Sequence, residues 1–321
     1  MKKIGIIGGG GYTAGELLRL LVHHPEVEVV VVESGSQAGK HVAEIHDDLV
    51  GETELKFAGA AGAKLGELDA VFLCMGHGVS RGWVDAHRPP KGTLVVDLST
   101  DYRMDEAWVY GLPEINRERI KGAKRIANPG CFATAIQLAI LPLAQAGLAE
   151  GELHVNALTG STGAGQSPSP TTHFSWRNGN VSVYKPFAHQ HLAEIGRSAA
   201  QVGRVATEGI NFLPVRGAFA RGIFCTTYLD CDLSETEAQD IFRDFYAGAA
   251  FTHVTDQPLH LKQVVNTNKG LVHVEKHGRK LLVTTAIDNL LKGASGQAVQ
   301  NMNLALGLRE GMGLRLKGSM F

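Results

Sequence analysis

The chain has little of three things: cysteine, net charge and long apolar runs. Only four of its 321 residues are cysteines, and their irregular spacing indicates a reducing compartment rather than a disulfide framework. The net charge of −1 gives no general attraction to nucleic acid or to an anionic membrane. No run of about 18 apolar residues is present to span a bilayer. We therefore expect a cytoplasmic protein that acts on a small molecule. A few cationic side chains should bind the anionic groups of that substrate.

The start of the chain does not have the form of a signal peptide. The apolar residues of 4–7 are too few for its hydrophobic region and are interrupted by Gly5. The length favours two domains, each large enough for its own core.

The apolar pattern predicts an α/β fold with two domains of different class. Over about the first 130 residues, β-type runs alternate with helical segments, which is typical of a Rossmann-type doubly wound sheet. These runs are 3–7, 27–32, 70–74 and 94–98. The later pattern, polar at alternate positions, favours an α+β domain with a mostly antiparallel sheet. Its expected strands are 153–160, 207–215, 222–231, 260–266, 271–276 and 280–287, and its expected helices are 189–202 and 234–247.

Two further segments are distinctive. Residues 161–188 are rich in glycine, serine and proline and show little periodicity, and a loop of that length in a compact domain is usually functional or mobile. Residues 295–308 are amphipathic and helical in pattern, so this last element is able to return to the first domain.

A glycine cluster lies between the first strand and the first helix. Glycines without a Cβ, together with free amides at a helix N-terminus, are what a pyrophosphate requires, so the segment predicts a dinucleotide site. The spacing is best described as G-x-x-G-x-x-x-G on Gly8, Gly11 and Gly15. The candidate residues are Gly8, Gly10, Gly11, Tyr12, Thr13, Ala14 and Gly15.

The end of the second strand leaves the choice of dinucleotide open. Glu33 stands where an acid would hold the ribose 2′-hydroxyl of NAD. Ser34, Ser36 and Lys40 follow, and their hydroxyls and ammonium group equally fit the 2′-phosphate of NADP.

Cys131 follows Asn128-Pro129-Gly130 and precedes an apolar helical run. A cysteine in the first turn of a helix has its thiolate favoured by the helix dipole and by unpaired backbone amides. The same amides can stabilise an oxyanion on a carbonyl that the sulfur attacks. A buried packing role is the alternative for Cys131, and packing is the expected role of Cys225 and Cys231.

Two histidines supply candidate proton carriers. His189 and His191 open an expected helix, and because they are two residues apart we expect them to point in different directions, with one facing the sulfur. No cysteine or acidic cluster accompanies them, so we expect no metal site.

The ordered set of motifs resembles the N-acetyl-gamma-glutamyl-phosphate reductases, arginine-pathway relatives of aspartate-semialdehyde dehydrogenase. The resemblance runs from residue 5 to about 310. Besides the glycine loop and the segments around Cys131 and His191, it rests on 96–103, 110–114, 160–165, 213–217 and 288–298.

The resemblance implies an NADPH-binding domain at 1–130 and 296–321 and a catalytic and dimerisation domain at 131–295. It implies that Cys131 attacks the acyl phosphate and that His191 is the acid and base, with homodimers or homotetramers as the assembly. The implied substrate-binding residues are Arg103, Arg216, Asn128 and Ser99, and Asn289 is expected near the nicotinamide. Planar guanidinium groups suit phosphate and carboxylate, although a surface or interdomain ion pair is the alternative for each arginine.

One departure from the family pattern bears on the cofactor. Relatives often carry Ser-Arg-Ser after the second strand, where this chain has Ser34-Gly35-Ser36. NADP is therefore favoured by resemblance alone, and NAD remains open.

Three rival functions are considered. Aspartate-semialdehyde dehydrogenase and a carrier-linked lysine-pathway reductase share the thioester chemistry and differ in the tail of the substrate. A non-catalytic dinucleotide sensor would leave Cys131, His191 and both arginines without a role. The N-acyl group, whether acetyl, succinyl or larger, is not determined by the sequence.

Overall fold

The computed structural model describes residues 1–59 and 64–319, so that residues 320 and 321 of the expected range 296–321 lie outside the described residues. The chain divides into two compact units. Unit 1 comprises Met1–Pro129 and Ala294–Arg315, and unit 2 comprises Gly130–Gly293 and Leu316–Phe321.

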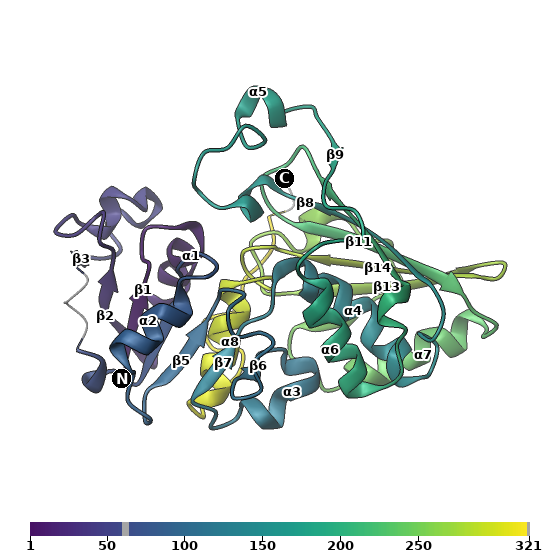
Figure 1. Cartoon of the computed structure of the whole chain (residues 1–321), viewed down its shortest axis with the longest axis horizontal. Helices are drawn as coiled ribbons and strands as arrows, with labels where there is room; N and C mark the ends of the chain where they lie inside the picture. Colours follow the sequence, from purple (N-terminus) through teal and green to yellow (C-terminus); the bar gives the residue numbers. More distant parts are fainter. Residues whose placement is uncertain (60–63, 320–321) are drawn as a thin grey trace. The chain divides into compact units, whose positions relative to one another are not determined.

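Unit 1 is built on a parallel sheet with strand order β3-β2-β1-β4-β5-β7-β6. Its central strands are buried and rich in Val, Ile and Leu, as expected where helices cover both faces of a parallel sheet. The expected doubly wound sheet is thereby confirmed (Figure 1). The strands are β1 (Lys2–Ile7), β2 (Val27–Glu33), β3 (Phe57–Ala58), β4 (Ala70–Leu73), β5 (Leu94–Asp97), β6 (Val109–Tyr110) and β7 (Arg125–Ala127), and the helices are α1 (Tyr12–Leu21), α2 (Ser80–His87), α3 (Pro113–Ile120) and α8 (Ser295–Ala305).

The last helix of the chain belongs to unit 1. Helix α8 packs against α1, α3 and β5, and Ser295 at its start donates a hydrogen bond to the Thr13 carbonyl oxygen at 2.7 Å. The expected helix at 295–308 is therefore present, although it ends at Ala305, where the Leu306 amide closes the last turn on Met302.

Unit 2 contains a mixed sheet with strand order β12-β13-β14-β11-β8-β10-β9. Two of its pairs, β8 with β10 and β12 with β13, are parallel, and the other four are antiparallel, which agrees with the expected mostly antiparallel sheet. The strands are β8 (Leu153–Thr159), β9 (Ser182–Val183), β10 (Ile210–Arg216), β11 (Ile223–Asp230), β12 (Thr252–Val254), β13 (Gly270–His277) and β14 (Lys280–Ile287), and the helices are α4 (Cys131–Gln145), α5 (Phe174–Arg177), α6 (Leu192–Val202) and α7 (Glu235–Tyr246).

Helix α4 is the core of unit 2. It packs against α6, α7 and strands β11, β13 and β14, and its residues from Phe132 to Ala144 are all buried (Figure 1). This explains why its sequence is apolar all round rather than on one stripe. A helix fixed on several sides holds its first residue in a defined place.

One expected strand of unit 2 was wrong, and another begins three residues later than expected. The strand expected at 260–266 is a 3₁₀ turn, Leu261–Gln263, in which the Gln263 side chain accepts a hydrogen bond from the His260 amide at 2.9 Å. Apolar residues at 261, 264 and 265 have the spacing of a helical turn. The expected strand at 207–215 starts only at Ile210, after a 3₁₀ turn at Thr207–Gly209. The short strand β12 was not anticipated.

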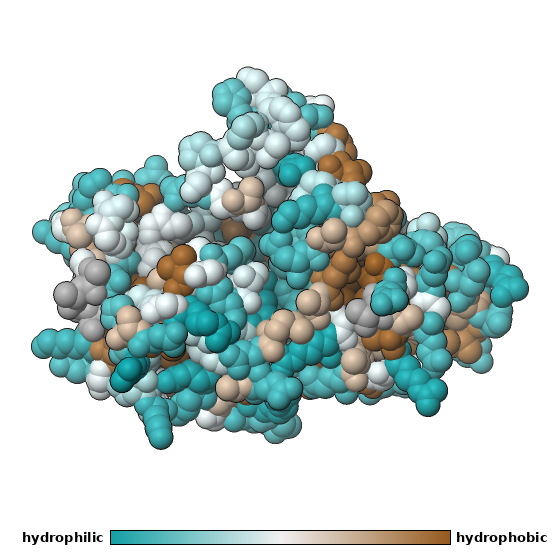
Figure 2. Space-filling view, in the orientation of Figure 1, coloured by the Kyte–Doolittle hydropathy of each residue, from teal (hydrophilic) through white to brown (hydrophobic). Residues whose placement is uncertain are grey.

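The segment 161–188 has more structure than its composition indicated. It contains a 3₁₀ turn at Ser161–Ala164, the single-turn helix α5 and the edge strand β9, which pairs with β10. Apolar surface is visible along β9 and the chain after it (Figure 2), where Val181, Val183 and Phe187 are exposed.

Candidate active site

Cys131 is the first residue of α4, as the sequence predicted. Gly130 is the N-cap in extended conformation, no side chain caps the helix, and the first turn has no acidic residue. The first amides of a helix lack intrahelical partners and carry partial positive charge. Cys131 is half-buried, so its sulfur stands in a field that favours thiolate and is not sealed in the core.

Backbone and aromatic groups of unit 2 surround Cys131 closely. A Cβ added to Gly293 would lie 2.8 Å from the Cβ of Cys131, so glycine is required at this position for the cysteine to keep its place. The pKa of the Tyr184 hydroxyl is raised, first by burial and then by the negative charge of Cys131, so Tyr184 lies within electrostatic range of the sulfur.

The two histidines are packed together before and at the start of α6. His191 is the N-cap, so the helix expected at 189–202 begins at Leu192 and His189 precedes it. The rings lie edge to face with centroids 4.6 Å apart, and the His191 amide donates to Nδ1 of His189 at 3.2 Å. The expectation that the side chains point in different directions was therefore wrong, because the helix begins only at Leu192 and helical spacing does not apply to His189 and His191.

His189 is held in its neutral form. Burial, followed by the positive charge of Lys185, lowers the pKa of His189 to about 4. Since its Nδ1 accepts a hydrogen bond, the proton of the neutral ring is on Nε2. Both histidine rings also contact Phe132, the second residue of α4, with centroids 5.4 and 6.4 Å away.

Glu194 is a site residue that sequence reasoning missed. Its carboxylate is buried, accepts a hydrogen bond from the Gly130 amide at 3.1 Å and lies 3.9 Å from Nε2 of His191. It thereby links the backbone before Cys131 to His191. The available signal was its position three residues after a helix-capping residue, where an acid interacts favourably with the first turn.

Arg216 ends strand β10 and lies over an aromatic ring. Its guanidinium carbon is 4.1 Å from the centroid of Tyr184, which is a cation–π contact. Over residues 1–59 and 64–319, no hydrogen bond or ion pair to Arg216 is found, so the ion pair considered as its alternative role is absent from this part of the chain. Its charge remains available to an anion.

Asn289 has a clear structural role in unit 2. Its Oδ1 accepts a hydrogen bond from the Gly222 amide at 2.7 Å, and its Nδ2 donates to Oγ1 of Thr162 at 3.0 Å. The side chain therefore fixes the turn that begins the 161–188 segment.

Three other predicted residues cluster within unit 1, after the carboxyl ends of β5 and β7. Oγ of Ser99 donates to Asp97 at 2.7 Å, and Nε of Arg103 donates to the Asn128 carbonyl oxygen at 2.9 Å. Arg103 is only 5% exposed, so it is not a surface ion pair. The Asn128 side chain donates to the Ala294 carbonyl oxygen at 3.0 Å.

At two positions of the glycine loop, Gly8 and Gly9, neighbouring atoms leave no room for a side chain. Gly8 has a φ of +82°, and a Cβ there would lie 2.9 Å from the backbone of Cys74. A Cβ on Gly9, a residue that was not singled out from the sequence, would lie 2.4 Å from Val32. Both amides donate to the Glu33 carbonyl oxygen, at 3.1 and 2.7 Å. These bonds hold the loop against the end of β2.

The rest of the loop opens α1. Gly11 is an N-cap with no side-chain cap and open space around its Cα, and Tyr12, Thr13 and Ala14 form an acid-free first turn. Gly15 lies against His46, whose ring would be 2.7 Å from an added Cβ. The His46 ring is also hydrogen-bonded to the Gly9 carbonyl oxygen at 2.7 Å. The loop is therefore a cradle of backbone amides without side chains, which fits a dinucleotide pyrophosphate.

An acid and two serines lie at and just after the end of β2. Glu33 is buried, its Oε2 has no hydrogen-bond partner among the described residues, and burial raises the pKa of its carboxyl group. Ser34 lies beside the loop, with Oγ 3.6 Å from where a Cβ of Gly10 would be, while Ser36 is exposed.

The cysteines differ in their electrostatics. Burial raises the pKa of Cys74 and of Cys225 to about 12, which keeps both thiols protonated. Cys225 and Cys231 are buried, in agreement with their expected packing role.

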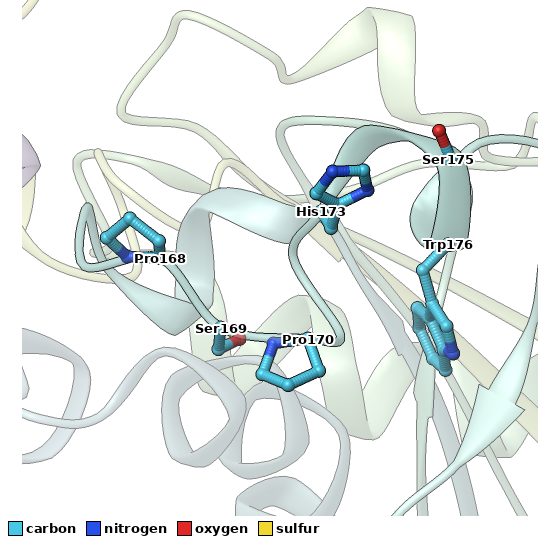
Figure 3. Close-up of a pocket in the computed structure, with 6 residues that line it drawn as sticks. All are labelled: Pro168, Ser169, Pro170, His173, Ser175 and Trp176. Carbon is cyan, nitrogen blue, oxygen red and sulfur yellow. The ribbon is translucent and has the colours of Figure 1, made fainter.

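An open hollow of about 590 Å³ lies outside this cluster (Figure 3). It is lined by residues of α5 and of the segment that leads into it, namely Pro168, Ser169, Pro170, His173, Ser175 and Trp176. None of the predicted site residues lines it.

Residues 1–59 and 64–319 contain neither a candidate membrane span nor a candidate metal site. No helix there is both long and apolar enough to cross a membrane. No group of three or more His, Cys, Asp or Glu residues is arranged to hold a metal ion.

Comparison with known families places both units in one group. Residues 3–123 match the NAD binding domain of semialdehyde dehydrogenase, and residues 131–289 match the semialdehyde dehydrogenase dimerisation domain. Similar proteins named N-acetyl-gamma-glutamyl-phosphate reductase come from Christiangramia forsetii, Parabacteroides distasonis and Flavobacterium johnsoniae, at 56%, 53% and 48% identity. Each alignment covers 100% of both chains.

Solved structures with a similar fold are aspartate-semialdehyde dehydrogenases. The Vibrio cholerae enzyme II in complex with ASA has a TM-score of 0.75 and 16% identity over 96% of this chain and 98% of its own. The Candida albicans enzyme with NADP has a TM-score of 0.73 and 17% identity over 95% and 98%. At this identity, the likeness shows the fold alone.

Proposed function

This chain belongs to the N-acetyl-gamma-glutamyl-phosphate reductases of the semialdehyde dehydrogenase family, and we propose how its residues perform that reaction. It is an oxidoreductase that converts an N-acyl-gamma-glutamyl phosphate to the semialdehyde in arginine biosynthesis. Full-length identity of up to 56% to enzymes of that name carries this assignment. The rival aspartate-semialdehyde dehydrogenases share only the fold, at 16–17% identity.

Cys131 is the nucleophile. Its thiolate attacks the γ-carbonyl carbon, and the resulting oxyanion is stabilised by amides at the start of α4. The phosphate leaves with its bonding electron pair, and a thioester on Cys131 remains. A nicotinamide cofactor held at the glycine loop and the start of α1 would supply the hydride that reduces this thioester. Collapse of the thiohemiacetal then releases the semialdehyde and the thiolate, so atoms and charge balance over the cycle.

His191 is the acid and base. The carboxylate of Glu194, 3.9 Å from Nε2 of His191, stabilises a protonated ring. His189 has its pKa lowered to about 4 and offers Nδ1 to the His191 amide, so its role is to position its neighbour. These features support His191 for moving the proton on and off the oxygen of the reacting carbon.

The glycine loop and the first turn of α1 hold the cofactor pyrophosphate. Backbone amides from Gly10 to Ala14 present partial positive charge, and the absence of side chains at Gly10 and Gly11 permits close approach. The resemblance assigns Asn289 to the nicotinamide end, and its contribution within unit 2 is to fix the turn at Thr162.

NADPH is the proposed electron donor. Ser34 and Ser36 supply hydroxyl donors for a 2′-phosphate after β2, and burial raises the pKa of the Glu33 carboxyl. An ionised Glu33 would instead favour the 2′-hydroxyl of NAD. Comparing kcat/KM for the two cofactors in wild type and in Glu33→Gln tests this assignment.

Arg103, Arg216, Asn128 and Ser99 bind the anionic groups of the substrate. Arg216 has the most available charge, whereas Arg103 is already bonded to a carbonyl oxygen and is held in a fixed orientation. We also propose a cytoplasmic location, because a thiol nucleophile needs a reducing compartment. We further propose that the chain forms homodimers or homotetramers. The matched dimerisation domain and the exposed apolar residues along edge strand β9 support the assembly.

The reverse reaction is the decisive assay. N-acetylglutamate semialdehyde, inorganic phosphate and NADP should together give reduced cofactor, followed by its absorbance. Activity that requires no phosphate, or a preference for aspartate semialdehyde, would contradict the proposal. Changing the N-acyl group and then the cofactor, one at a time, resolves substrate and dinucleotide.

A further inference from the structure

Arg177 is a buried charge that the chemistry above does not use. It ends helix α5 and is only 7% exposed. Its Nη2 donates to the Thr159 carbonyl oxygen at 2.9 Å, but its buried Nε has no hydrogen-bond partner among residues 1–59 and 64–319. A buried charged group normally has its hydrogen bonds satisfied, because an unmade bond leaves a donor removed from water without compensation. An acceptor is therefore expected for Nε.

Arg216 lies next to this orphaned group. Thr159, whose carbonyl oxygen binds Arg177, is the register partner of Arg216 in the parallel pair β8–β10. The positive charge of Arg216 contributes, after burial, to lowering the pKa of Arg177. Two guanidinium groups thus lie close together, and guanidinium does not give up its proton to relieve the repulsion.

Ser182 adds a third donor to the same place. It is the register partner of Arg216 in the antiparallel pair β9–β10, so the two side chains point to the same face of the sheet. Oγ of Ser182 is also buried without a partner in the described part of the chain. Two guanidinium groups and a hydroxyl, each with a donor that lacks an acceptor among the described residues, make an oxyanion site from residues far apart in sequence.

Tyr184 connects this donor cluster to the nucleophile. The guanidinium carbon of Arg216 lies 4.1 Å from the centroid of its ring. The charges of Cys131 and of both arginines shift the pKa of its hydroxyl. An anion held by the arginines therefore lies within electrostatic range of the reacting sulfur. Segment 153–184 contains no Lys, Arg, Asp or Glu other than Arg177, so no carboxylate of that segment competes for the site.

We propose that Arg177 and Arg216 together grip one oxyanion of the substrate, with Ser182 as an additional donor, so that Arg177 is a specificity-determining residue. The group is the phosphoryl group or the carboxylate of the glutamyl substrate. This inference rests on the proposed function. A purely structural role, anchoring α5 to β8 through Thr159, is the competing explanation.

The test measures KM for inorganic phosphate and for N-acetylglutamate semialdehyde separately, in the reverse assay, with Arg177→Gln. We expect one of the two KM values to rise about 10- to 100-fold while kcat changes less than about fivefold. A rise in KM for phosphate identifies the phosphoryl group, and a rise in KM for the semialdehyde identifies the carboxylate. Arg204→Gln, at an arginine with an 83% exposed side chain in unit 2, is the matched control and should leave both values unchanged.

A double-mutant cycle excludes the purely structural role. If both arginines hold one anion, the KM of Arg177→Gln/Arg216→Gln rises less than the product of the single effects. Strict multiplicativity, or unchanged KM values in a folded Arg177→Gln variant, overturns the proposal. Should Arg177→Gln prove unstable, Arg177→Lys keeps the charge and should give a smaller rise in the same KM.

A readout without turnover separates this proposal from the proposed function. Inorganic phosphate and N-acetylglutamate are each tested for their ability to slow alkylation of Cys131 by iodoacetamide. Protection that is present in wild type and lost in Arg177→Gln supports the anion site even if the reverse assay is inactive. Equal protection in both proteins overturns it even if the enzyme is active.

Discussion

Two helices, one in each unit, begin in the same way, and we propose different chemistry for them. Both α1 and α4 have a glycine N-cap in extended conformation, no side-chain cap and no acidic residue in the first turn. At α1 the residues that follow are Tyr12 and Thr13, and the loop before it is all glycine. At α4 the first residue is Cys131, and a carboxylate and two histidines are packed around the turn.

The difference shows that the residues around an uncapped helix start decide which group its free amides can bind. In unit 1 the open space at Gly11 leaves the amides to a ligand. In unit 2 the Gly130 amide donates to Glu194, so the proposed stabilisation of thiolate and oxyanion falls to the amides that follow. The four predictions that follow test this division of labour.

The largest effect is expected at the first residue of α4. Cys131→Ser should lower kcat by at least about 10³-fold, because a serine hydroxyl at this position remains protonated and is a poor nucleophile. Binding of the dinucleotide, measured by fluorescence titration, should stay within about twofold of wild type. Cys231→Ser, at a buried cysteine, is the control and should stay active. Substantial turnover by Cys131→Ser would remove the nucleophile assignment.

The histidine pair should divide into one reactive and one positioning residue. His191→Asn should lower kcat by about 10²-fold or more, the usual size of general acid–base catalysis, and should flatten the pH–rate profile. His189→Asn should lower kcat less and keep the shape of that profile, because the pKa of His189 is already lowered to about 4. A larger loss in His189→Asn than in His191→Asn would reverse the two roles.

His189 also makes unit 2 sensitive to acid. Its pKa is lowered in the folded protein from 6.5 to about 4, so the unfolded chain takes up the proton first and stability falls as pH drops through this window. Above pH 6.5 the contribution is fully present. After allowance for solvent screening, His189 should account for about 2 kcal/mol of the loss between pH 7 and pH 4. Urea unfolding of wild type and His189→Gln over that range measures it, and parallel pH slopes would refute the assignment.

The smallest effect is expected at the start of α1. Gly11→Ala has open space and an ordinary φ of −97°, so the free energy of unfolding should change by less than about 1 kcal/mol. The added Cβ should nevertheless weaken dinucleotide binding about tenfold, because it obstructs the approach of the pyrophosphate. Gly92→Ala, also in open space, is the matched control and should leave binding unchanged. Unchanged affinity in Gly11→Ala would mean that the cofactor does not pass over this loop.

Sequence reasoning succeeded where the signal was local. The parallel sheet of unit 1, the helix beginning at Cys131 and the packing of Cys225 follow from short patterns of apolar residues, glycine and proline. It failed where a pattern fits two structures, as at 260–266, whose apolar residues suit a helical turn as well as a strand. It also gave the wrong geometry for His189 and His191, since the position of the helix cap decides how their rings meet.

By itself, the sequence determined the class of fold, the family and the position of Cys131 at the start of a helix, because these depend on neighbours a few residues apart. Only the tertiary structure decided that Glu194 meets Gly130, that Arg177 lies against Thr159 beside Arg216, and that His189 is buried neutral. Such contacts join segments from different strands and helices. Their energies depend on burial and on the charges nearby, which no local pattern encodes.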